Sequence, residues 1–169
     1  MRQRYWQWER AMPVIKYQAV VPGVPEQVYE YVTGFSATGS VNRKALEDKH
    51  GRLIEQQGDT YTFQDDSDGG TVWHCTYDPP ERRVMRAPEA RWADRIDLFQ
   101  PSPDGTLWTV FWEPKVKGIR AYTQWLMFYI RGKSRVYQSI IMPVVSHFQE
   151  GPTRRSQRST TRSTRRRRR

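Results

Sequence analysis

The sequence has one cysteine and no long apolar run, and both absences exclude whole classes of protein. Because Cys75 is the single cysteine among 169 residues, the chain cannot close an internal disulfide of the kind that secreted small domains rely on. The longest strongly apolar stretch, Trp125 to Ile130, is far shorter than the roughly 20 residues that a membrane-spanning helix needs. Residues 1–12 are polar and charged, without the apolar segment of a signal peptide. We therefore expect a soluble, cytoplasmic protein.

Histidine is also scarce, and the three histidines do not form a metal-binding pattern. His50, His74 and His147 lack the close spacing of zinc ligands, and there is no second cysteine to join them. His74 and Cys75 are adjacent, so on a strand they point to opposite faces and cannot act as a dyad. We expect no metal and no cofactor.

Acidic residues are absent from the C-terminal end of the chain, where positive charge is concentrated. Nine of the arginines behind the net charge of +10 lie in residues 152–169, so residues 1–151 carry a net charge of only +1. A nucleic-acid-binding domain normally carries its basic surface on the fold itself. The charge pattern therefore argues against a nucleic-acid-binding domain and assigns the basic character to the tail.

Composition divides the chain into three parts. Residues 1–12 form a leader that we expect to be disordered, and residues 13–150 form a single domain. Residues 151–169 consist mostly of Arg, Ser and Thr, which cannot build a core, so we expect a disordered tail. Arg154 to Arg169 would contact polyanions nonspecifically and in a salt-dependent way.

The domain begins with a strand and two short helices. Residues 14–21 are rich in β-branched and aromatic residues and end at Pro22 and Gly23. Pro25 and Glu26 suit the first turn of a helix over residues 24–32, and a second short helix is predicted over residues 41–49.

A long β region and a long helix follow. Short turns rich in Gly, Pro and Asp separate consecutive β segments, which predicts an antiparallel meander. After Gly118 the apolar spacing changes to three and four, which predicts a helix of about 30 residues to about residue 149. Pro143 should kink this helix near Ile140 or end it. The predicted strands are 52–57, 59–65, 71–77, 82–86, 92–100 and 106–113.

This element order, with the segment Val-Pro-Glu-Gln-Val-Tyr-Glu-Tyr-Val at residues 24–32, resembles the START-like (SRPBCC) helix-grip superfamily of polyketide cyclase/dehydrase and lipid-transport domains. The resemblance covers residues 13–149. It implies an α+β fold in which a curved antiparallel sheet of six to seven strands wraps around one long C-terminal helix, with two short helices after the first strand. It also implies a cavity between sheet and helix for an apolar small molecule.

Side-chain alternation predicts which face of two strands points inward. Tyr61 and Phe63 share one face of their strand, opposite Thr60, Thr62 and Gln64. In residues 92–98 Trp92, Ile96 and Leu98 share one face with Asp94, opposite Arg95 and Asp97, so Asp94 points inward if this apolar face is the covered one. Residues 106–113 are apolar on both faces, so polarity does not orient that strand.

On the implied fold, aromatic side chains of the sheet and the long helix are candidates for the lining of the cavity, where an apolar body and a polar tip would hold a lipid, quinone or polyketide-like ligand. The alternative is ordinary core packing. The candidate ligand-binding residues are Tyr61, Phe63, Trp73, Tyr77, Trp92, Trp108, Tyr122, Trp125 and Tyr129.

Two further functions stay open at this point. In the first, the same cavity catalyses a cyclase or dehydratase reaction, with Asp94, Tyr61 and Tyr129 as candidate acid/base groups, because an inward-facing carboxylate has a raised pKa. For Asp94 the alternative is a strand-end residue that reaches solvent or pairs with Arg91 or Arg95. In the second, the protein associates with nucleic acid through the arginine-rich tail.

Overall fold

The computed structural model describes residues 14–66, 69–88, 93–115 and 119–150. The leader and the arginine-rich tail, for which we predicted disorder, lie outside these residues. Within the described part of the chain, no helix is both long enough and apolar enough to cross a membrane.

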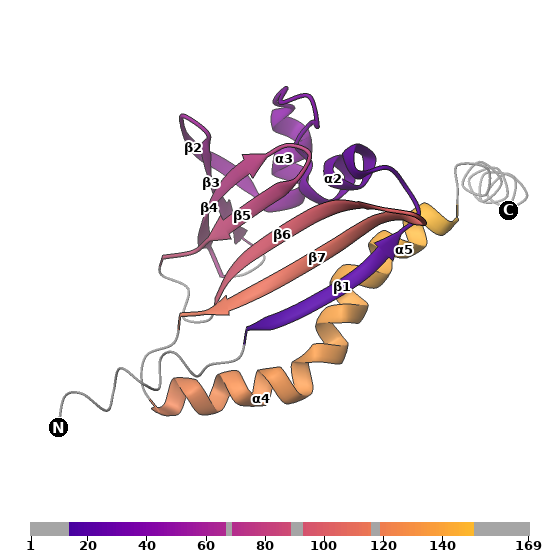
Figure 1. The fold of residues 1–169 in the computed structure, drawn as a ribbon. Coiled ribbons are helices and arrows are strands. Elements are labelled where there is room, and N and C mark those ends of the chain that lie inside the picture. Colours follow the sequence, from indigo (N-terminus) through magenta and orange to yellow (C-terminus); the bar gives the residue numbers. More distant parts are fainter. Residues whose placement is uncertain (1–13, 67–68, 89–92, 116–118, 151–169) are drawn as a thin grey trace, which may run out of the picture.

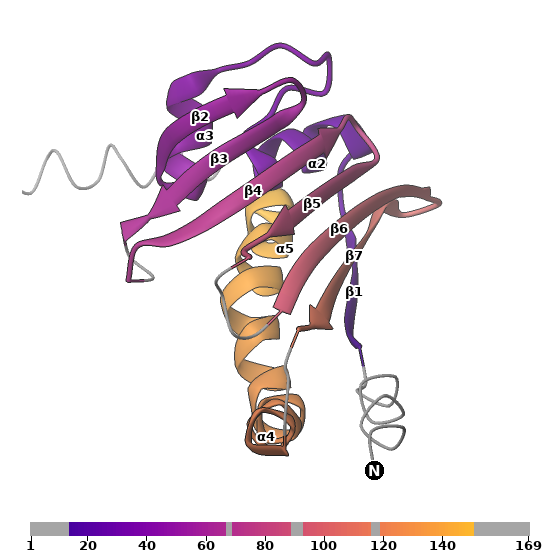
Figure 2. The same cartoon turned by 90° about the vertical axis from the view of Figure 1, so that its left-hand side faces the viewer.

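Seven antiparallel strands form one curved sheet, and helices pack against one of its faces (Figures 1 and 2). The strand order is β1-β7-β6-β5-β4-β3-β2, so β2 to β7 form the predicted meander. The last strand, β7, also pairs with the first strand, β1. The strands are β1 (Ile15–Val21), β2 (Arg52–Gln57), β3 (Thr60–Asp65), β4 (Thr71–Asp78), β5 (Arg82–Arg86), β6 (Ala93–Ser102) and β7 (Gly105–Pro114). The predicted α+β helix-grip architecture is confirmed.

Two short helices connect β1 to β2, as the sequence predicted. Helix α2 (Pro25–Thr33) begins with Pro25, whose missing N–H is not needed in the first turn, and ends at Gly34 in the left-handed conformation. Helix α3 (Arg43–His50) begins at Asn42, whose side-chain Oδ1 accepts a hydrogen bond from the Ala45 amide at 3.1 Å. These helices lie over one end of the sheet (Figure 1).

The long C-terminal helix is continuous but irregular. It consists of α4 (Ile119–Val136), a π-helical turn η2 (Tyr137–Ile141) and α5 (Met142–Gln149), and Figure 1 shows it bending along its length. Pro143 explains the irregularity, because it cannot donate to the carbonyl four residues earlier and its ring clashes with that turn. The helix is irregular near Ile140, in the region where Pro143 predicted a kink or an end, and the π-helical turn places Ser139 and Ile140 on the wall of a pocket.

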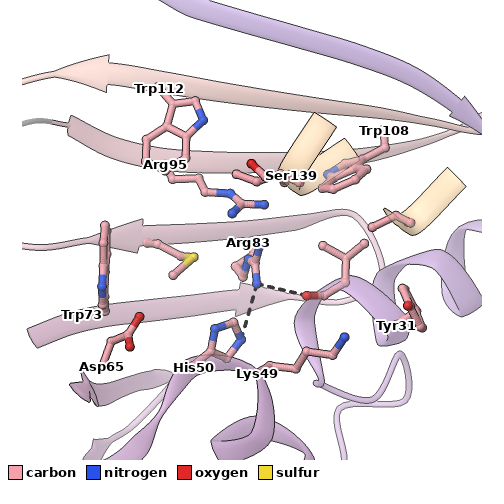
Figure 3. Close-up of a pocket in the computed structure, with 14 residues that line it drawn as sticks. Tyr31, Lys49, His50, Asp65, Trp73, Arg83, Arg95, Trp108, Trp112 and Ser139 are labelled. Carbon is pink, nitrogen blue, oxygen red and sulfur yellow. Dashed lines mark hydrogen bonds between the residues drawn. The ribbon is translucent and has the colours of Figure 1, made fainter. Parts of the chain in front are cut away.

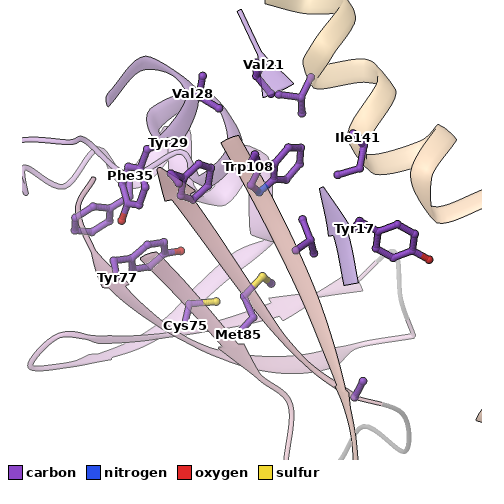
Figure 4. Packing of buried hydrophobic residues seen from close by; sticks show 14 of the residues in the cluster. Tyr17, Val21, Val28, Tyr29, Phe35, Cys75, Tyr77, Met85, Trp108 and Ile141 are labelled. Carbon is purple, nitrogen blue, oxygen red and sulfur yellow. The ribbon is translucent and has the colours of Figure 1, made fainter. Parts of the chain in front are cut away.

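The core forms where the inner face of the sheet meets α2 and the long helix. Trp108 of β7 and Trp125 of α4 are among its largest fully buried side chains, and Tyr29 of α2 packs edge-to-face on Phe99 at 5.3 Å between ring centroids. Figure 4 shows Trp108 between Tyr29 and Ile141 in this packing. As predicted, Tyr61 and Phe63 are buried, and Cys75 is a buried small hydrophobe, since burial raises the pKa of its thiol to about 11.

The predicted orientation of residues 92–98 is wrong. Ala93, Arg95, Asp97 and Phe99 face the interior, whereas Asp94, Ile96 and Leu98 lie on the opposite face of β6. The register is unambiguous, because Asp97 lies opposite Val110 and Phe99 lies opposite the buried Trp108, whereas Ile96 and Leu98 lie opposite Phe111 and Thr109. Polarity misled the prediction because this strand buries a charged pair, which alternation assigns to solvent.

Gly51 joins α3 to β2 in a conformation that other residues rarely adopt. Its φ is 91°, and a Cβ atom there would lie 2.3 Å from the Gln64 carbonyl oxygen, a backbone atom that cannot move aside easily. We expect Gly51→Ala to lower the free energy of unfolding by about 2–3 kcal/mol.

Gly58 offers the matched control for this substitution. Its φ is 58°, but no atom lies within 4 Å of a Cβ placed there, so Gly58→Ala should cost only about 1 kcal/mol. Urea unfolding of both variants separates the clash from the backbone strain. An equal loss of unfolding free energy in the two variants would show that the close approach to the Gln64 carbonyl does not add to the cost of Gly51→Ala.

Candidate ligand-binding site

A pocket of about 410 Å³ opens between the sheet, the two short helices and the kinked helix. Figure 3 shows its walls: tryptophans and arginines from the strands on one side, and α2 and α3 residues on the other. Its size falls within the about 300–1,000 Å³ that is usual for small-molecule sites. The lining residues are Tyr31, Val32, Lys49, His50, Asp65, Trp73, Arg83, Met85, Arg95, Trp108, Trp112, Ser139, Ile140 and Val144.

The floor of this pocket is a buried ionic network on β5, β6 and β7. Arg83 and Asp97 are direct cross-strand neighbours, and the Arg83 Nε and Nη2 atoms donate to Asp97 Oδ2 at 3.0 and 2.7 Å. Arg95 donates from Nε and Nη2 to Asp97 Oδ1 at 3.3 and 2.9 Å, and Trp108 Nε1 donates to the same oxygen at 3.0 Å. One carboxylate therefore accepts five hydrogen bonds and is shared by two guanidinium groups.

Burial makes the charges of this network strongly interdependent. The exposed fractions of the Arg83, Asp97 and Arg95 side chains are 2%, 0% and 13%. Burial alone would raise the pKa of Asp97, but the two arginines outweigh it and hold that pKa below its usual value. Burial lowers the pKa of Arg95, and the neighbouring Arg83 adds to this against the opposing effect of Asp97.

The C-terminal end of α2 supplies further partners to the floor. The last turn of a helix leaves carbonyl groups without helical partners, and here the Thr33 carbonyl lies 2.7 Å from His50 Nε2. His50 Nε2 therefore carries its hydrogen and donates it. Arg83 Nη1 donates to the Val32 carbonyl at 3.4 Å, which places a guanidinium at the negative end of the helix.

His50 is held neutral in this position. Burial, followed by the charge of Arg83, lowers its pKa to about 3. Arg83 Nη1 is also 3.4 Å from His50 Nε2, but that nitrogen is already a donor to Thr33 and cannot accept (Figure 3). The contact between these two residues is therefore not a good hydrogen bond.

The aromatic residues predicted to bind ligand divide between the pocket and the core. Trp73 and Trp108 line the pocket. The remaining described candidates do not line it: Tyr61, Phe63, Tyr77 and Trp125 are buried in the core, Tyr129 packs against it, and Tyr122 is half-buried on α4. Trp92 lies outside the described residues. Tyr61 packs edge-to-face with Phe35 and Tyr77, and its hydroxyl accepts from Gln56 Nε2 at 3.2 Å.

The predicted acid/base candidates do not meet at the pocket. Asp94 lies on the outer face of β6, where it forms an ion pair with Lys115, and its expected inward orientation is wrong. Tyr61 belongs to the aromatic cluster described above, and burial raises the pKa of its hydroxyl. Among the described residues, the pocket walls include neither these two groups nor Tyr129.

Sequence reasoning missed the charged members of the site. Arg83 and Met85 share one face of β5, and Arg82, Val84 and Arg86 share the other, so each face carries at least one arginine and one apolar residue. The sequence pattern of β5 therefore does not indicate which of its two faces points into the protein. The pairing of Arg83 with Asp97 across β5 and β6 would have indicated that both side chains point inward, but this register is a property of the folded sheet.

Comparison with known proteins bears on the fold. No protein-family model matches the chain, and no curated protein matches its sequence. Among solved structures, the di-domain aromatase/cyclase StfQ from the steffimycin biosynthetic pathway matches with a TM-score of 0.53 at 13% identity, over 85% of this chain and 54% of StfQ. The match therefore spans about half of StfQ.

Two further structures match over nearly their whole length. A Thermobifida fusca protein solved by NMR matches with a TM-score of 0.53 at 10% identity, over 81% of this chain and 93% of that protein. A Staphylococcus aureus protein of unknown function matches with a TM-score of 0.51 at 14% identity, over 84% and 96% of the two chains. With the sheet order and the C-terminal helix, these likenesses show that the chain has the α+β helix-grip fold of these structures.

Proposed function

We propose that this protein binds an apolar or aromatic small molecule in the pocket between its sheet and its kinked C-terminal helix. The observation that carries the proposal is the presence of two half-buried tryptophans, Trp73 and Trp112, on the walls of one pocket of about 410 Å³, which the fully buried Trp108 also borders. Tryptophan offers a large flat apolar surface, and burying such surface against a ligand is favourable by roughly 25 cal/mol per Å².

Aliphatic side chains of the sheet and of the C-terminal helix support the same kind of ligand. Met85 of β5, Ile140 of the π-helical turn and Val144 of α5 add aliphatic surface to the aromatic surface of the sheet. A π-helical turn inside a longer helix frequently accompanies a functional site. The pocket thus combines this apolar surface with polar and charged side chains, and small-molecule sites are built from both kinds of surface.

Binding is proposed in preference to turnover. Catalysis by acid and base requires titratable groups within reach of the bound molecule. The described candidates for that role, Asp94, Tyr61 and Tyr129, do not line the pocket. The polyketide cyclase or dehydratase alternative therefore loses the three residues on which it rested.

A bulky side chain that fills the pocket should strongly weaken ligand binding. We expect Ile140→Trp to place an indole in the pocket and to weaken binding of the neutral fluorophore N-phenyl-1-naphthylamine by about tenfold or more. The measurement is a fluorescence titration of the full chain, accompanied by native mass spectrometry of any molecule that co-purifies with it.

Ile130→Trp is the matched control, because Ile130 lies on the same long helix, is 64% exposed and is not part of the pocket wall. It should leave the affinity unchanged. If the fluorophore fails to bind the unmodified protein, or if it binds the Ile140→Trp variant as tightly as the unmodified protein, the pocket is not a binding site for apolar molecules.

A further inference from the structure

We propose that the preferred ligand carries one anionic group, a carboxylate or a comparable acid, and that Arg95, assisted by Arg83, holds this group at the floor of the pocket. This inference rests on the proposed function, since it specifies the ligand class of the same pocket. It is carried by the charges and by the hydrogen-bond donors that the protein leaves without acceptors.

The first observation is a surplus of positive charge in the floor. Two buried guanidinium groups share the single carboxylate of Asp97, and the neighbouring His50 is neutral. Buried charges are normally paired, because removing an ion from water is costly unless an opposite charge compensates it. An anion beside these arginines would complete the pairing.

The second observation is that donors of the floor lack good acceptors. Arg95 donates its two hydrogen bonds from Nε and Nη2, and its Nη1 has no acceptor among the residues that the structure describes. Arg83 Nη1 has only the two contacts of 3.4 Å, one of them to the N–H of His50. Trp112 Nε1 is buried and has no partner in the described part of the chain.

These donors belong to one end of the pocket. Arg95 lies opposite Trp112 in the register of β6 and β7, and its guanidinium is 5.6 Å from the centre of the Trp112 ring. Arg95 also lies opposite Met85, two residues from Arg83 on β5. An arginine fork beside an N–H donor is the arrangement that binds a planar oxyanion well.

The other charged residues that line the pocket do not supply an acceptor or a negative charge to Arg95 and Trp112. The Asp65 carboxylate lies on β3 on the same face as Trp73, and two strands separate β3 from β6. Figure 3 shows Asp65 beside Trp73 and away from the Trp112 end. Lys49 lies over the Tyr31 ring at 4.3 Å and adds a further cation to the lining. The Val32 carbonyl of α2 partly compensates the charge of Arg83. Arg95 shares Asp97 with Arg83 and has no such carbonyl partner among the described residues, so it is the cation that an anionic ligand would pair with first.

The geometry implies how such a ligand would lie. Its acidic group would accept hydrogen bonds from Arg95 Nη1 and Trp112 Nε1, while its apolar body would extend between Trp73, Trp108 and the Ile140 turn. A ligand without the acid would gain the apolar contacts alone and would leave the donors unmatched. The difference between two such ligands isolates the contribution of the floor.

Two fluorophores with the same aromatic frame provide this comparison. 8-Anilinonaphthalene-1-sulfonate carries an anionic group, and N-phenyl-1-naphthylamine lacks it. We expect the full chain to bind the sulfonate about tenfold more tightly, since a charge-assisted hydrogen bond is worth about that factor. Arg95→Met should remove this preference and leave the affinity for the neutral fluorophore within about threefold.

Three controls make the result specific. Arg86→Met removes the same charge from an exposed position on β5 and should keep the preference. Arg95→Gln is measured in parallel with Arg95→Met, and retained binding of the neutral fluorophore reports that each variant is folded. Ile140→Trp should abolish binding of both fluorophores, so sulfonate binding that survives this substitution places it elsewhere on the chain and overturns the assignment to the floor.

The outcomes separate the two proposals. If the neutral fluorophore does not bind the unmodified protein, the proposed function fails, whether or not the sulfonate binds. If the neutral fluorophore binds but the sulfonate binds no better, or if the preference survives both substitutions of Arg95, the ligand-binding function stands and the anionic-ligand inference is wrong.

Discussion

Asp97→Asn should lower the free energy of unfolding by about 3–5 kcal/mol, the range observed when one partner of a buried ion pair is removed. The carboxylate accepts hydrogen bonds from both arginines and from Trp108, and its side chain is fully buried. An amide of the same shape has one acceptor oxygen and presents N–H groups to a guanidinium that is itself only a donor. Urea unfolding at neutral pH measures the loss.

Asp94→Asn is the matched control for this experiment. Asp94 lies on the same strand, but it faces the opposite side of the sheet and pairs with Lys115, and the two side chains are 17% and 28% exposed. Its loss should cost less than about 1 kcal/mol. In addition, Arg95→Met in the Asp97→Asn background should restore part of the stability, because it removes one of the two unpaired cations. A loss of equal size at both aspartates would contradict the central role of Asp97.

The stability of the protein should fall steeply between pH 6.5 and pH 3 because of His50. Its pKa is about 3 in the folded state and about 6.5 when unfolded, so the unfolded chain takes up a proton in this interval and the folded chain does not. The stabilisation is therefore complete above about pH 6.5 and is lost as the pH falls. At about 1.4 kcal/mol per pH unit, we expect the protein to be about 2 kcal/mol less stable at pH 5 than at pH 7.5.

Measurements between pH 5 and pH 7.5 isolate this effect from that of Asp97. The lowered pKa of Asp97 stabilises the fold above the ordinary carboxyl pKa of about 4, and that contribution is lost only as the pH falls below it. His50→Gln keeps a donor for the Thr33 carbonyl and removes the titrating group, so the slope should largely disappear. His74→Gln, on the opposite side of the sheet, should retain it. An unchanged slope in His50→Gln would show that the imidazole is not the group responsible.

Much of the fold followed from local patterns in the sequence. The strand 52–57 was predicted with its observed ends, and a disturbance of the long helix before Pro143 was predicted from the geometry of proline. Turn residues and hydrophobic spacing act over a few neighbours, so they determine the elements and their order without reference to the rest of the chain. The short connections then restrict consecutive strands to antiparallel pairing.

The candidate site was predicted only in part. Trp73 and Trp108 were selected for their aromatic character and do line the pocket, but the same reasoning also selected Phe63 and Trp125, which fill the core. Aromatic residues serve both purposes, and the sequence pattern does not distinguish a wall from a packed interior. Arg83 and Arg95 were missed because charged residues are expected to face solvent. In this protein both pair with Asp97 on the buried face of the sheet.

The sequence by itself determined which segments are helix and strand, how they follow one another, and that one face of the sheet must be covered. Only the tertiary structure decided which face of β6 is inside and which polar groups meet there. The physical reason is that an ion pair between Arg83 and Asp97 depends on the pairing of β5 with β6, fourteen residues apart, and not on either strand alone. That register sets the pairing of Arg83 with Asp97 in the floor, and the packing of α2 and α3 on the sheet then buries His50 beside it.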